Sequence, residues 1–337
     1  MNTMFENQEN FQDQFVLNPS DVNCNPASFG VTPKAVLKRR LEYLSELEAE
    51  TDKLLFHGRG RSRCDANLVK VAEFLGSQPD NLVFVENPTA GINSVINSLK
   101  WSANDTIVMA SHAFEGVNNT MHALADRYGF DLHIIDMPWP IHSEDQVIDE
   151  FVQACSTTNV KLVLLDWISC PSGILFPIHK IIKALEQYQP MIMLDGAHAP
   201  GQIADLDLEN IGVDFFVGCL HKWCYAPIST AVLWVHPNHQ AWLKPHMASV
   251  YYKKSFKKDF YWFGSSDITR YFCASDALEF YQSVGGHKVI TKHITQMLDF
   301  WEKLLIDSFG VKPAPIPISM RAPFLRLVGK GNFLKTF

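Results

Sequence analysis

The sequence predicts an α/β fold in which a mostly parallel, seven-stranded sheet carries helices on both faces and is followed by a small α+β domain. First, seven short β-branched or apolar runs alternate with segments of helical periodicity, as is typical of a buried parallel sheet. Second, 337 residues, 47% hydrophobic and 19% charged, suffice for one large α/β domain or two domains of unequal size. Third, the alternation stops after residue 235.

The elements of the sheet domain follow from these runs in order. The strands are predicted at 82–86, 106–110, 132–136, 161–166, 191–195, 214–218 and 230–235. The helices between them are predicted at 89–100, 116–128, 143–155 and 177–188.

Outside this core, Thr32-Pro33 opens a long amphipathic helix predicted over 32–53, because proline suits the first helical turn. The expected divisions are an N-terminal segment (1–50) that packs with the small domain, a large domain (51–250) and a small domain (251–337). The small domain is predicted to hold a lysine- and aromatic-rich loop at 250–263, a helix at 275–307 and a strand at 325–328. A single strand leaves backbone groups without partners, so this domain is expected to be incomplete.

Charge and cysteine usage narrow the class of protein. The formal net charge of −7 and the pI near 6.0 argue against a general nucleic-acid binder. The one dense basic run, 253–258, is interpreted as a solvated loop. Seven cysteines without a CxxC pair indicate reduced thiols and no structural zinc site. The first fifteen residues resemble neither a signal nor a transit peptide, and no apolar run approaches the roughly 18 residues that span a bilayer. A cytoplasmic protein is expected.

Unusual polar residues follow the strands, where an open parallel sheet binds its ligands. After the first strand, the turn Asn87-Pro88-Thr89-Ala90-Gly91 opens a helix; it suits a phosphate, and equally an N-cap formed by Thr89. Ser111-His112-Ala113-Phe114 follows the second strand, and residues 166–173 begin at the end of the fourth.

The two strands that follow end in charged groups. Asp195-Gly196-Ala197-His198 ends one, and a buried carboxylate there is costly unless it is paired with a cationic donor. Cys219-Leu220-His221-Lys222-Trp223 ends the next. A phosphate-binding turn, an aromatic ring, an Asp and a Lys together are what pyridoxal phosphate needs: an imine-forming amine, a carboxylate for the pyridine nitrogen and a helix N-terminus.

At these residues the sequence resembles the class V aminotransferase superfamily of fold-type I pyridoxal phosphate enzymes, and within it the isopenicillin N epimerase-like branch. The likeness covers about residues 16 to 328. The matching stretches are Ser28-Phe29-Gly30 with Thr32-Pro33, VFVENPTAGIN at 83–93, PSGILFP at 171–177, and DGAHAPG at 195–201 continuing to His221-Lys222-Trp223.

The resemblance implies that Lys222 forms the internal aldimine and later moves the proton at the substrate α-carbon. It implies that Asp195 pairs with the pyridinium nitrogen and that His198 supports the phenolic oxygen or the ring face of the cofactor. These three are the predicted catalytic residues.

The remaining contacts to pyridoxal 5'-phosphate are implied in the same way. Thr89, Ala90 and His221 would hold the phosphate. Phe114 would stack on the ring, with His112 as the competing choice. Ser169, with Asp166 beside it, would line the same side, and Ser265 would complete the set. Ser265 matches a hydroxyl that reaches the phosphate across a subunit interface in such enzymes, so the resemblance implies a homodimer with shared active sites.

The sequence also departs from the family pattern. Cys219 stands where many relatives have a serine, and a thiol is a poorer hydrogen-bond partner for phosphate. Ser265 and Ser266 stand where the epimerase-like pattern has threonine and arginine. Relatives continue beyond the strand at 325–328 and supply an arginine for the substrate carboxylate, so a C-terminally truncated chain is expected.

The expected function is pyridoxal phosphate chemistry at the α-carbon of an amino acid or amino-acid derivative. Epimerisation, C–S elimination and transamination all remain open. Cysteine desulfuration is disfavoured: the resemblance implies that the cysteine that carries the persulfide lies in the C-terminal region, and no cysteine follows Cys273. The alternative is an inactive or unstable truncated homologue that binds the cofactor or serves as a partner subunit. A dinucleotide site at His57-Gly58-Arg59-Gly60 is disfavoured because no strand leads into it.

Overall fold

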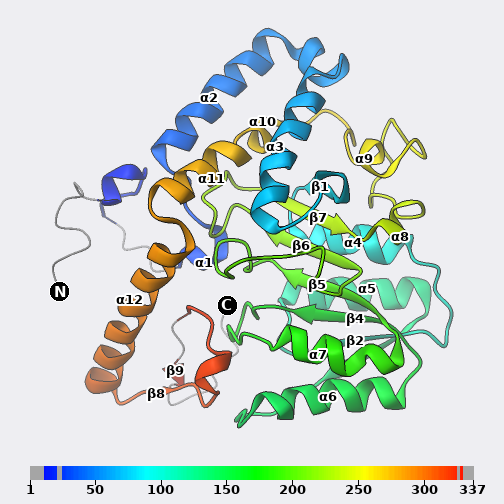
Figure 1. The fold of residues 1–337 in the computed structure, drawn as a ribbon, viewed down its shortest axis with the longest axis vertical. Helices are drawn as coiled ribbons and strands as arrows, with labels where there is room; N and C mark the ends of the chain where they lie inside the picture. The colour runs from blue at the N-terminus through cyan, green and yellow to red at the C-terminus, as the bar shows by residue number, and fades with distance from the viewer. Residues whose placement is uncertain (1–10, 21–24, 325–326, 329–337) are drawn as a thin grey trace.

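The computed structural model describes residues 11–20, 25–324 and 327–328, and a seven-stranded sheet lies at its centre (Figure 1). The strands are β1 (Leu82–Val85), β2 (Thr106–Ala110), β3 (Asp131–Ile135), β4 (Val160–Asp166), β5 (Met191–Gly196), β6 (Phe215–Cys219) and β7 (Ala231–Val235). Their order is β1-β7-β6-β5-β4-β2-β3, and within this sheet only β7 runs antiparallel to its neighbours. The predicted mostly parallel sheet is confirmed, with each strand end within one residue of its predicted position.

Alternate residues of the strands face two separate cores. On β2, Ile107 and Met109 belong to one core, while Val108 and Ala110 belong to the other. The first core is covered by α4 (Pro88–Ser98) and α5 (Glu115–Tyr128), and the second by α3 (Arg59–Leu75), α6 (Glu144–Thr157) and α7 (Ile178–Leu185). Because both faces are covered, the strands other than the edge strand β3 are mostly buried and apolar, which made them recognisable in the sequence.

The helix α3 was missed by the sequence analysis. It begins after Gly58, whose φ of +84° is left-handed, and Gly60 lies in its first turn. Two glycines and several charges obscure the buried positions Leu68, Val71 and Leu75, whose spacing of three and four residues is helical. The Gly-x-Gly motif therefore starts a helix rather than a nucleotide-binding turn.

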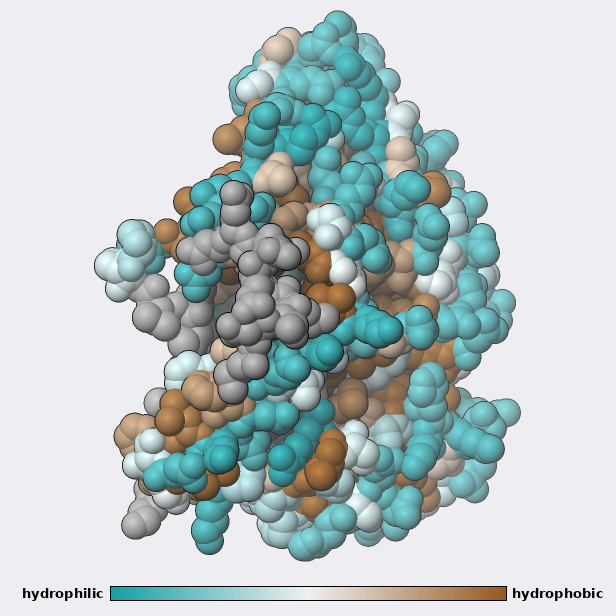
Figure 2. All heavy atoms as spheres, turned by 60° about the vertical axis from the view of Figure 1, so that its left-hand side comes forward, coloured by the Kyte–Doolittle hydropathy of each residue, from teal (hydrophilic) through white to brown (hydrophobic). Residues whose placement is uncertain are grey.

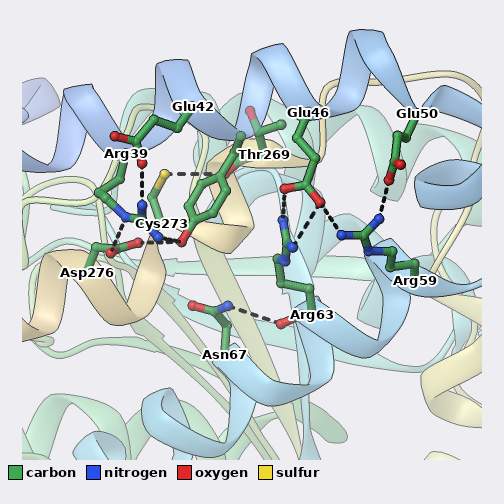
Figure 3. A network of polar contacts seen from close by, with 11 residues as sticks. Arg39, Glu42, Glu46, Glu50, Arg59, Arg63, Asn67, Thr269, Cys273 and Asp276 are labelled. Atoms are coloured by element: carbon green, nitrogen blue, oxygen red, sulfur yellow. Dashed lines mark hydrogen bonds and ion pairs between the residues drawn. The ribbon is translucent and has the colours of Figure 1, made fainter.

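Ion pairs join α3 to α2 (Lys34–Ala49), the shorter form of the helix predicted at 32–53 (Figure 3). Glu46 accepts from Arg63 at 2.7 Å and 3.1 Å and pairs with Arg59 at 2.8 Å, while Glu50 also pairs with Arg59. A bidentate arginine–carboxylate contact and its neighbours thus join the C-terminal end of α2 to the first turns of α3.

Glu209 joins the end of α3 to the sheet. Its carboxylate accepts hydrogen bonds from Ser77 Oγ and the Gln78 N–H, both at 2.9 Å, from Asn81 at 3.0 Å and from the Trp234 indole at 3.3 Å. Burial raises the pKa of Glu209, but these donors outweigh it and the net pKa is lowered.

The predicted helix at 275–307 is two helices, α11 (Ala274–Ser283) and α12 (Gly286–Phe309). Gly285 and Gly286, with φ of +103° and +59°, break it, because only glycine adopts such angles at low cost. Along α12 a stripe of large apolar residues is 40% exposed or more; its members are Met297, Phe300, Trp301, Leu304 and Phe309. Figure 2, which turns this side forward, shows hydrophobic side chains among hydrophilic ones in its lower left part.

The predicted strand at 325–328 is described only as β9 (Leu327–Val328); residues 325–326 lie outside the described chain. The sequence predicted a single strand here, which is wrong: β8 (Lys312–Pro313) pairs with it antiparallel. The loop predicted at 250–263 contains a short helix, because Ser255 caps the N–H of Lys258 at 3.3 Å.

The remaining short helices are η1 (Phe11–Gln14), α1 (Pro26–Phe29), η2 (Asp52–Phe56), η3 (Pro79–Asn81), η4 (Glu186–Tyr188), α8 (Pro237–Gln240), α9 (Phe256–Asp259), α10 (Thr269–Phe272) and η5 (Ile318–Met320). In the described parts of the chain, no helix combines the length and the apolar character needed to cross a membrane.

Candidate functional site

The candidate site lies at the carboxyl edge of β4, β5 and β6. Asp166 and Asp195 are paired residues on the neighbouring strands β4 and β5, and each side chain is about 5% exposed. Asp195 Oδ1 accepts the N–H of Ala197 at 2.9 Å, whereas Asp166 Oδ2 is buried with no hydrogen-bond partner among the described residues. Two buried carboxyl groups therefore end adjacent strands.

Burial dominates the electrostatics of this pair. It raises the pKa of Asp166 well above its ordinary value, and the charge of Asp195 raises it further. Burial also raises the pKa of Asp195, against the lowering effects of the Ala197 N–H and of Lys222. A cationic group placed beside these oxygens would relieve the cost of ionising them.

Lys222 lies in the connection that follows β6. Its Nζ is 3.2 Å from Nε2 of His198, and the indole N–H of Trp223 donates to Nδ1 of the same ring at 3.2 Å. Because an indole nitrogen can only donate, Nδ1 of His198 carries no proton, and the proton of the neutral ring lies on Nε2. The structure thus brings together three residues predicted from the sequence: Lys222 and His198 are in contact, and the charge of Lys222 acts on Asp195.

His221, next to Lys222, is held in another direction. Its Nδ1 contacts the carbonyl oxygen of Thr230, the residue before β7, at 2.9 Å. The ring is 8% exposed, and burial lowers its pKa although this hydrogen bond raises it. A neutral ring with Nδ1 bound to a carbonyl leaves Nε2 as the acceptor.

Gly30 supports the backbone of the Lys222 turn. Its φ is +69°, and a Cβ at this position would lie 1.9 Å from the carbonyl oxygen of His221 and 2.7 Å from that of Lys222. Glycine is therefore required both by conformation and by the close approach of the two chain segments. Gly30 lies in the matching stretch Ser28-Phe29-Gly30, but no role for it could be predicted from the sequence.

The turn before α4 is capped by Asn87, not by Thr89. Asn87 Oδ1 accepts the N–H of Ala90 at 2.9 Å, and Pro88 occupies the first helical turn. Thr89 and Ala90 are partly exposed at the start of an 11-residue helix, where the positive end of the helix dipole favours an anion.

His112 and Ser169 lie together on the same edge, after β2 and β4. Ser169 Oγ donates to the carbonyl oxygen of His112 at 2.6 Å, Ser172 Oγ lies 2.8 Å from Ser169 Oγ, and His112 Nδ1 lies 3.0 Å from Ser172 Oγ. Burial lowers the pKa of His112, although Asp136 raises it. Ser172 was missed by the sequence analysis, because a serine before a glycine in a turn is an ordinary turn residue.

Phe114, the other predicted stacking residue, precedes α5 and is 46% exposed. Its ring lies over Gly116, where an added Cβ would approach it to 2.6 Å. Of the two competing residues, His112 is therefore the one that hydrogen bonds hold at the strand edge.

Ser265 lies apart from this group. It is exposed and lines a cavity of about 220 Å³ together with Glu86, Arg270 and aromatic residues of the 251–263 segment. None of Asp195, His198 and Lys222 lines that cavity. A role for Ser265 in its own chain's site is therefore not supported, and the predicted role across an interface stays a prediction.

The residues at the edge fit pyridoxal 5'-phosphate. The orphaned carboxylate oxygen of Asp166 beside Asp195 suits a protonated ring nitrogen, Lys222 offers an amine, and the N-terminus of α4 suits a phosphate.

Comparison with known proteins agrees with this reading. The family model described as Aminotransferase class-V matches residues 25–313. "Hercynylcysteine sulfoxide lyase" of Schizosaccharomyces pombe is 26% identical over 91% of this chain and 80% of the relative. "Isopenicillin N epimerase" of Streptomyces clavuligerus is 26% identical over 73% of this chain and 61% of the relative. Across the first five curated relatives, the chain spans between 48% and 80% of their length.

Among solved structures, a cystine C-S lyase, C-DES, in complex with its product cysteine persulfide, has a TM-score of 0.74 at 18% identity. The match covers 86% of this chain and 80% of that one. This similarity confirms the predicted fold type.

Proposed function

Because the chain belongs to the class V aminotransferase family, we propose that it is a pyridoxal phosphate-dependent enzyme that acts at the α-carbon of an amino acid or amino-acid derivative. The observation that carries this proposal is the grouping of Lys222 and His198 with the buried carboxyl pair Asp166 and Asp195 at one edge of the sheet. When bound, the cofactor supplies an electron sink for the negative charge that develops at the α-carbon.

The side chains would divide the work by their chemistry. Asp195, with Asp166 beside it, would hold a proton on the ring nitrogen, because two buried carboxyl groups favour a cation between them. Lys222 Nζ would attach the cofactor covalently and, once released, move the proton at the α-carbon. His198 would donate from Nε2, since Trp223 occupies its Nδ1. The N-terminus of α4 with Thr89 and Ala90 would hold the phosphate.

For the reaction, we favour elimination at a C–S bond. The fission yeast relative is named a sulfoxide lyase and the structural neighbour a C-S lyase. In this reaction Lys222 takes the α-proton, the C–S bond breaks with its electron pair going to sulfur, and the sulfur group leaves. The remaining enamine takes up water and yields a 2-oxo acid and ammonia. Epimerisation and transamination are the other outcomes of the same proton removal.

We further propose a cytoplasmic homodimer with shared sites. The exposed position of Ser265, away from Lys222, supports a contribution to a partner's site. The cysteines that the structure describes are free thiols, which fits a reducing compartment. The divisions 1–50, 51–250 and 251–337 remain our proposal for the domains. Sedimentation, and activity recovered by mixing Lys222→Ala with Ser265→Ala subunits, would test the shared site.

The test of the main proposal is covalent attachment of the cofactor. Purified protein is incubated with pyridoxal phosphate, reduced with borohydride and digested, and the modified peptide is identified by mass spectrometry. Modification at Lys222 is expected, with loss of the visible absorbance band in Lys222→Ala and its retention in Lys180→Ala, a matched change at an exposed lysine. Release of a 2-oxo acid from S-substituted cysteines then tests the elimination. Well-folded protein without an adduct would favour the alternative of a non-catalytic homologue.

A further inference from the structure

The hydroxyl groups of Ser169 and Ser172 close a ring of hydrogen bonds around His112. The ring runs from His112 Nδ1 to Ser172 Oγ (3.0 Å), to Ser169 Oγ (2.8 Å) and back to the carbonyl oxygen of His112 (2.6 Å). Ser169 is 0% exposed and Ser172 5% exposed, so water does not compete for these contacts.

The direction of each hydrogen bond follows from the chemistry of the groups. A carbonyl oxygen only accepts, so the single hydroxyl proton of Ser169 is committed to His112. The short contact between the two hydroxyls therefore requires Ser172 to donate. With its own proton used, Ser172 Oγ can only accept from His112, which places the imidazole proton on Nδ1.

We propose that Ser172, with Ser169, is a positioning residue that fixes His112 as the tautomer with a protonated Nδ1 and a bare, hydrogen-bond-accepting Nε2. The inference concerns the apo protein, and its use in catalysis rests on the proposed function. Nε2 makes no hydrogen bond to another described residue, and the ring is only partly exposed. His112 therefore offers an acceptor at the strand edge.

The segment that carries the two serines is itself held in place. The N–H of Gly173 donates to the carbonyl oxygen of Ser169 at 2.7 Å, and the N–H of Ser169 donates to Ile174 at 2.9 Å. Leu175 in turn donates to the carbonyl oxygen of Met320 at 2.8 Å, which ties the turn to the C-terminal region. The hydroxyl positions are thus set by backbone contacts on both sides.

The other histidine of the edge is fixed in the opposite tautomer. Trp223 donates to Nδ1 of His198, which places the proton of that ring on Nε2. The site therefore offers one imidazole acceptor, from His112, and one imidazole donor, from His198. A bound group that carries a proton is matched to His112, and a group that carries an unshared oxygen lone pair is matched to His198.

The test is NMR of the histidine ring nitrogens in cofactor-free protein labelled with the heavy nitrogen isotope, with His112→Gln to assign the signals. The wild type is expected to show a protonated Nδ1 and a bare Nε2 for His112. Ser172→Ala is expected to move the proton toward Nε2 and, in the loaded enzyme, to lower kcat/KM about fivefold, the worth of one ordinary hydrogen bond. Ser172→Thr, which keeps the hydroxyl, should restore both, and Ser283→Ala, an exposed hydroxyl on α11, should change neither.

Ser169→Ala gives a sharper result. It leaves Ser172 in place but frees its proton, so Ser172 can donate to Nδ1 and the His112 proton is expected on Nε2. A role in packing alone predicts no such change. A bare Nδ1 in the wild type, or an unchanged tautomer in Ser169→Ala, would overturn the inference. Since this measurement needs neither cofactor nor turnover, its failure is separate from a failure of Lys222 to bind the cofactor.

Discussion

Gly30 is predicted to be the glycine whose replacement most directly disturbs the Lys222 turn. In Gly30→Ala, the new Cβ would lie 1.9 Å from the carbonyl oxygen of His221. That is about 1.6 Å closer than the roughly 3.5 Å at which nonbonded heavy atoms make optimal contact. The opposing atom belongs to the backbone, so the chain at His221 and Lys222 must move.

The magnitude has two parts. A left-handed φ costs a non-glycine residue roughly 1–2 kcal/mol, and relieving an overpacked contact typically costs a further 1–3 kcal/mol. The free energy of unfolding should therefore fall by about 2–5 kcal/mol. With about 2.1 cal/mol/K of unfolding entropy per residue, each kcal/mol corresponds to roughly 1.4 °C in Tm for a chain of this length. The expected loss in Tm is about 3–7 °C.

Gly129→Ala is the matched control. Gly129 has a similar φ of +74°, but an added Cβ there meets nothing within 4 Å. It should lose only the conformational part, about 1.5–3 °C in Tm by the same entropy scale. Thermal unfolding of the two variants separates the clash from the strain, and cofactor titration of Gly30→Ala should show weakened attachment at Lys222. Equal losses of Tm in both variants would refute the close approach of Gly30 to His221.

Three further outcomes are expected. Burial and the charge of Asp195 raise the pKa of Asp166, so ionising this carboxyl group costs stability as the pH rises above the ordinary aspartate pKa of 3.8. Asp166→Asn should therefore raise the Tm of the apo protein at pH 7 but not below about pH 3.8. An equal gain in Tm at every pH would contradict this. The pKa of Glu209 is lowered, so its contribution to stability is present above the ordinary glutamate pKa of 4.5 and is lost as the pH falls through its pKa in the folded protein. In denaturant titrations, Glu209→Gln should lower the free energy of unfolding by about 1 kcal/mol at pH 7 and by less near pH 3. Burial raises the pKa of Cys219 to about 12; it also raises the pKa of Cys170, but Cys170 is the one partly exposed thiol among the described cysteines. Mass spectrometry after treatment with a thiol reagent should therefore show Cys170 as the most reactive of the described cysteines, with its label lost in Cys170→Ser and unchanged in Cys219→Ser.

The sheet was predictable from the sequence because its strands, apart from the edge strand β3, are buried on both faces and therefore mostly apolar. Two helical features were not. The glycines at 58 and 60 hide the start of α3, and the break at Gly285-Gly286 depends on backbone angles that composition alone does not fix. The positions of the strand ends could be predicted, and with them the placement of Asp166, Asp195 and Lys222 at the carboxyl edge of the sheet.

Partners within the site were harder to predict than its members. Asn87, which caps the helix, and Thr89, the predicted cap, are only two positions apart in the sequence. Ser172 becomes informative only when folding places it between His112 and Ser169. Sequence patterns mark the groups that carry charge, while the hydroxyls that orient them resemble ordinary turn residues.

The position of β7 has a consequence for how the protein is made. Among the described residues β1 pairs only with β7, and Leu82 is paired with Trp234, more than a hundred residues later in the chain. During synthesis, β1 must therefore wait for most of the sheet domain to emerge before it gains its place. Such distant pairings slow folding, because the entropy of closing a long loop is lost before the contact forms. The helix α4, which follows β1, also packs on β6 and β7 and is fixed against the sheet only at that stage. The turn before α4, where we propose that the phosphate binds, is therefore expected to be among the last parts of the molecule to form.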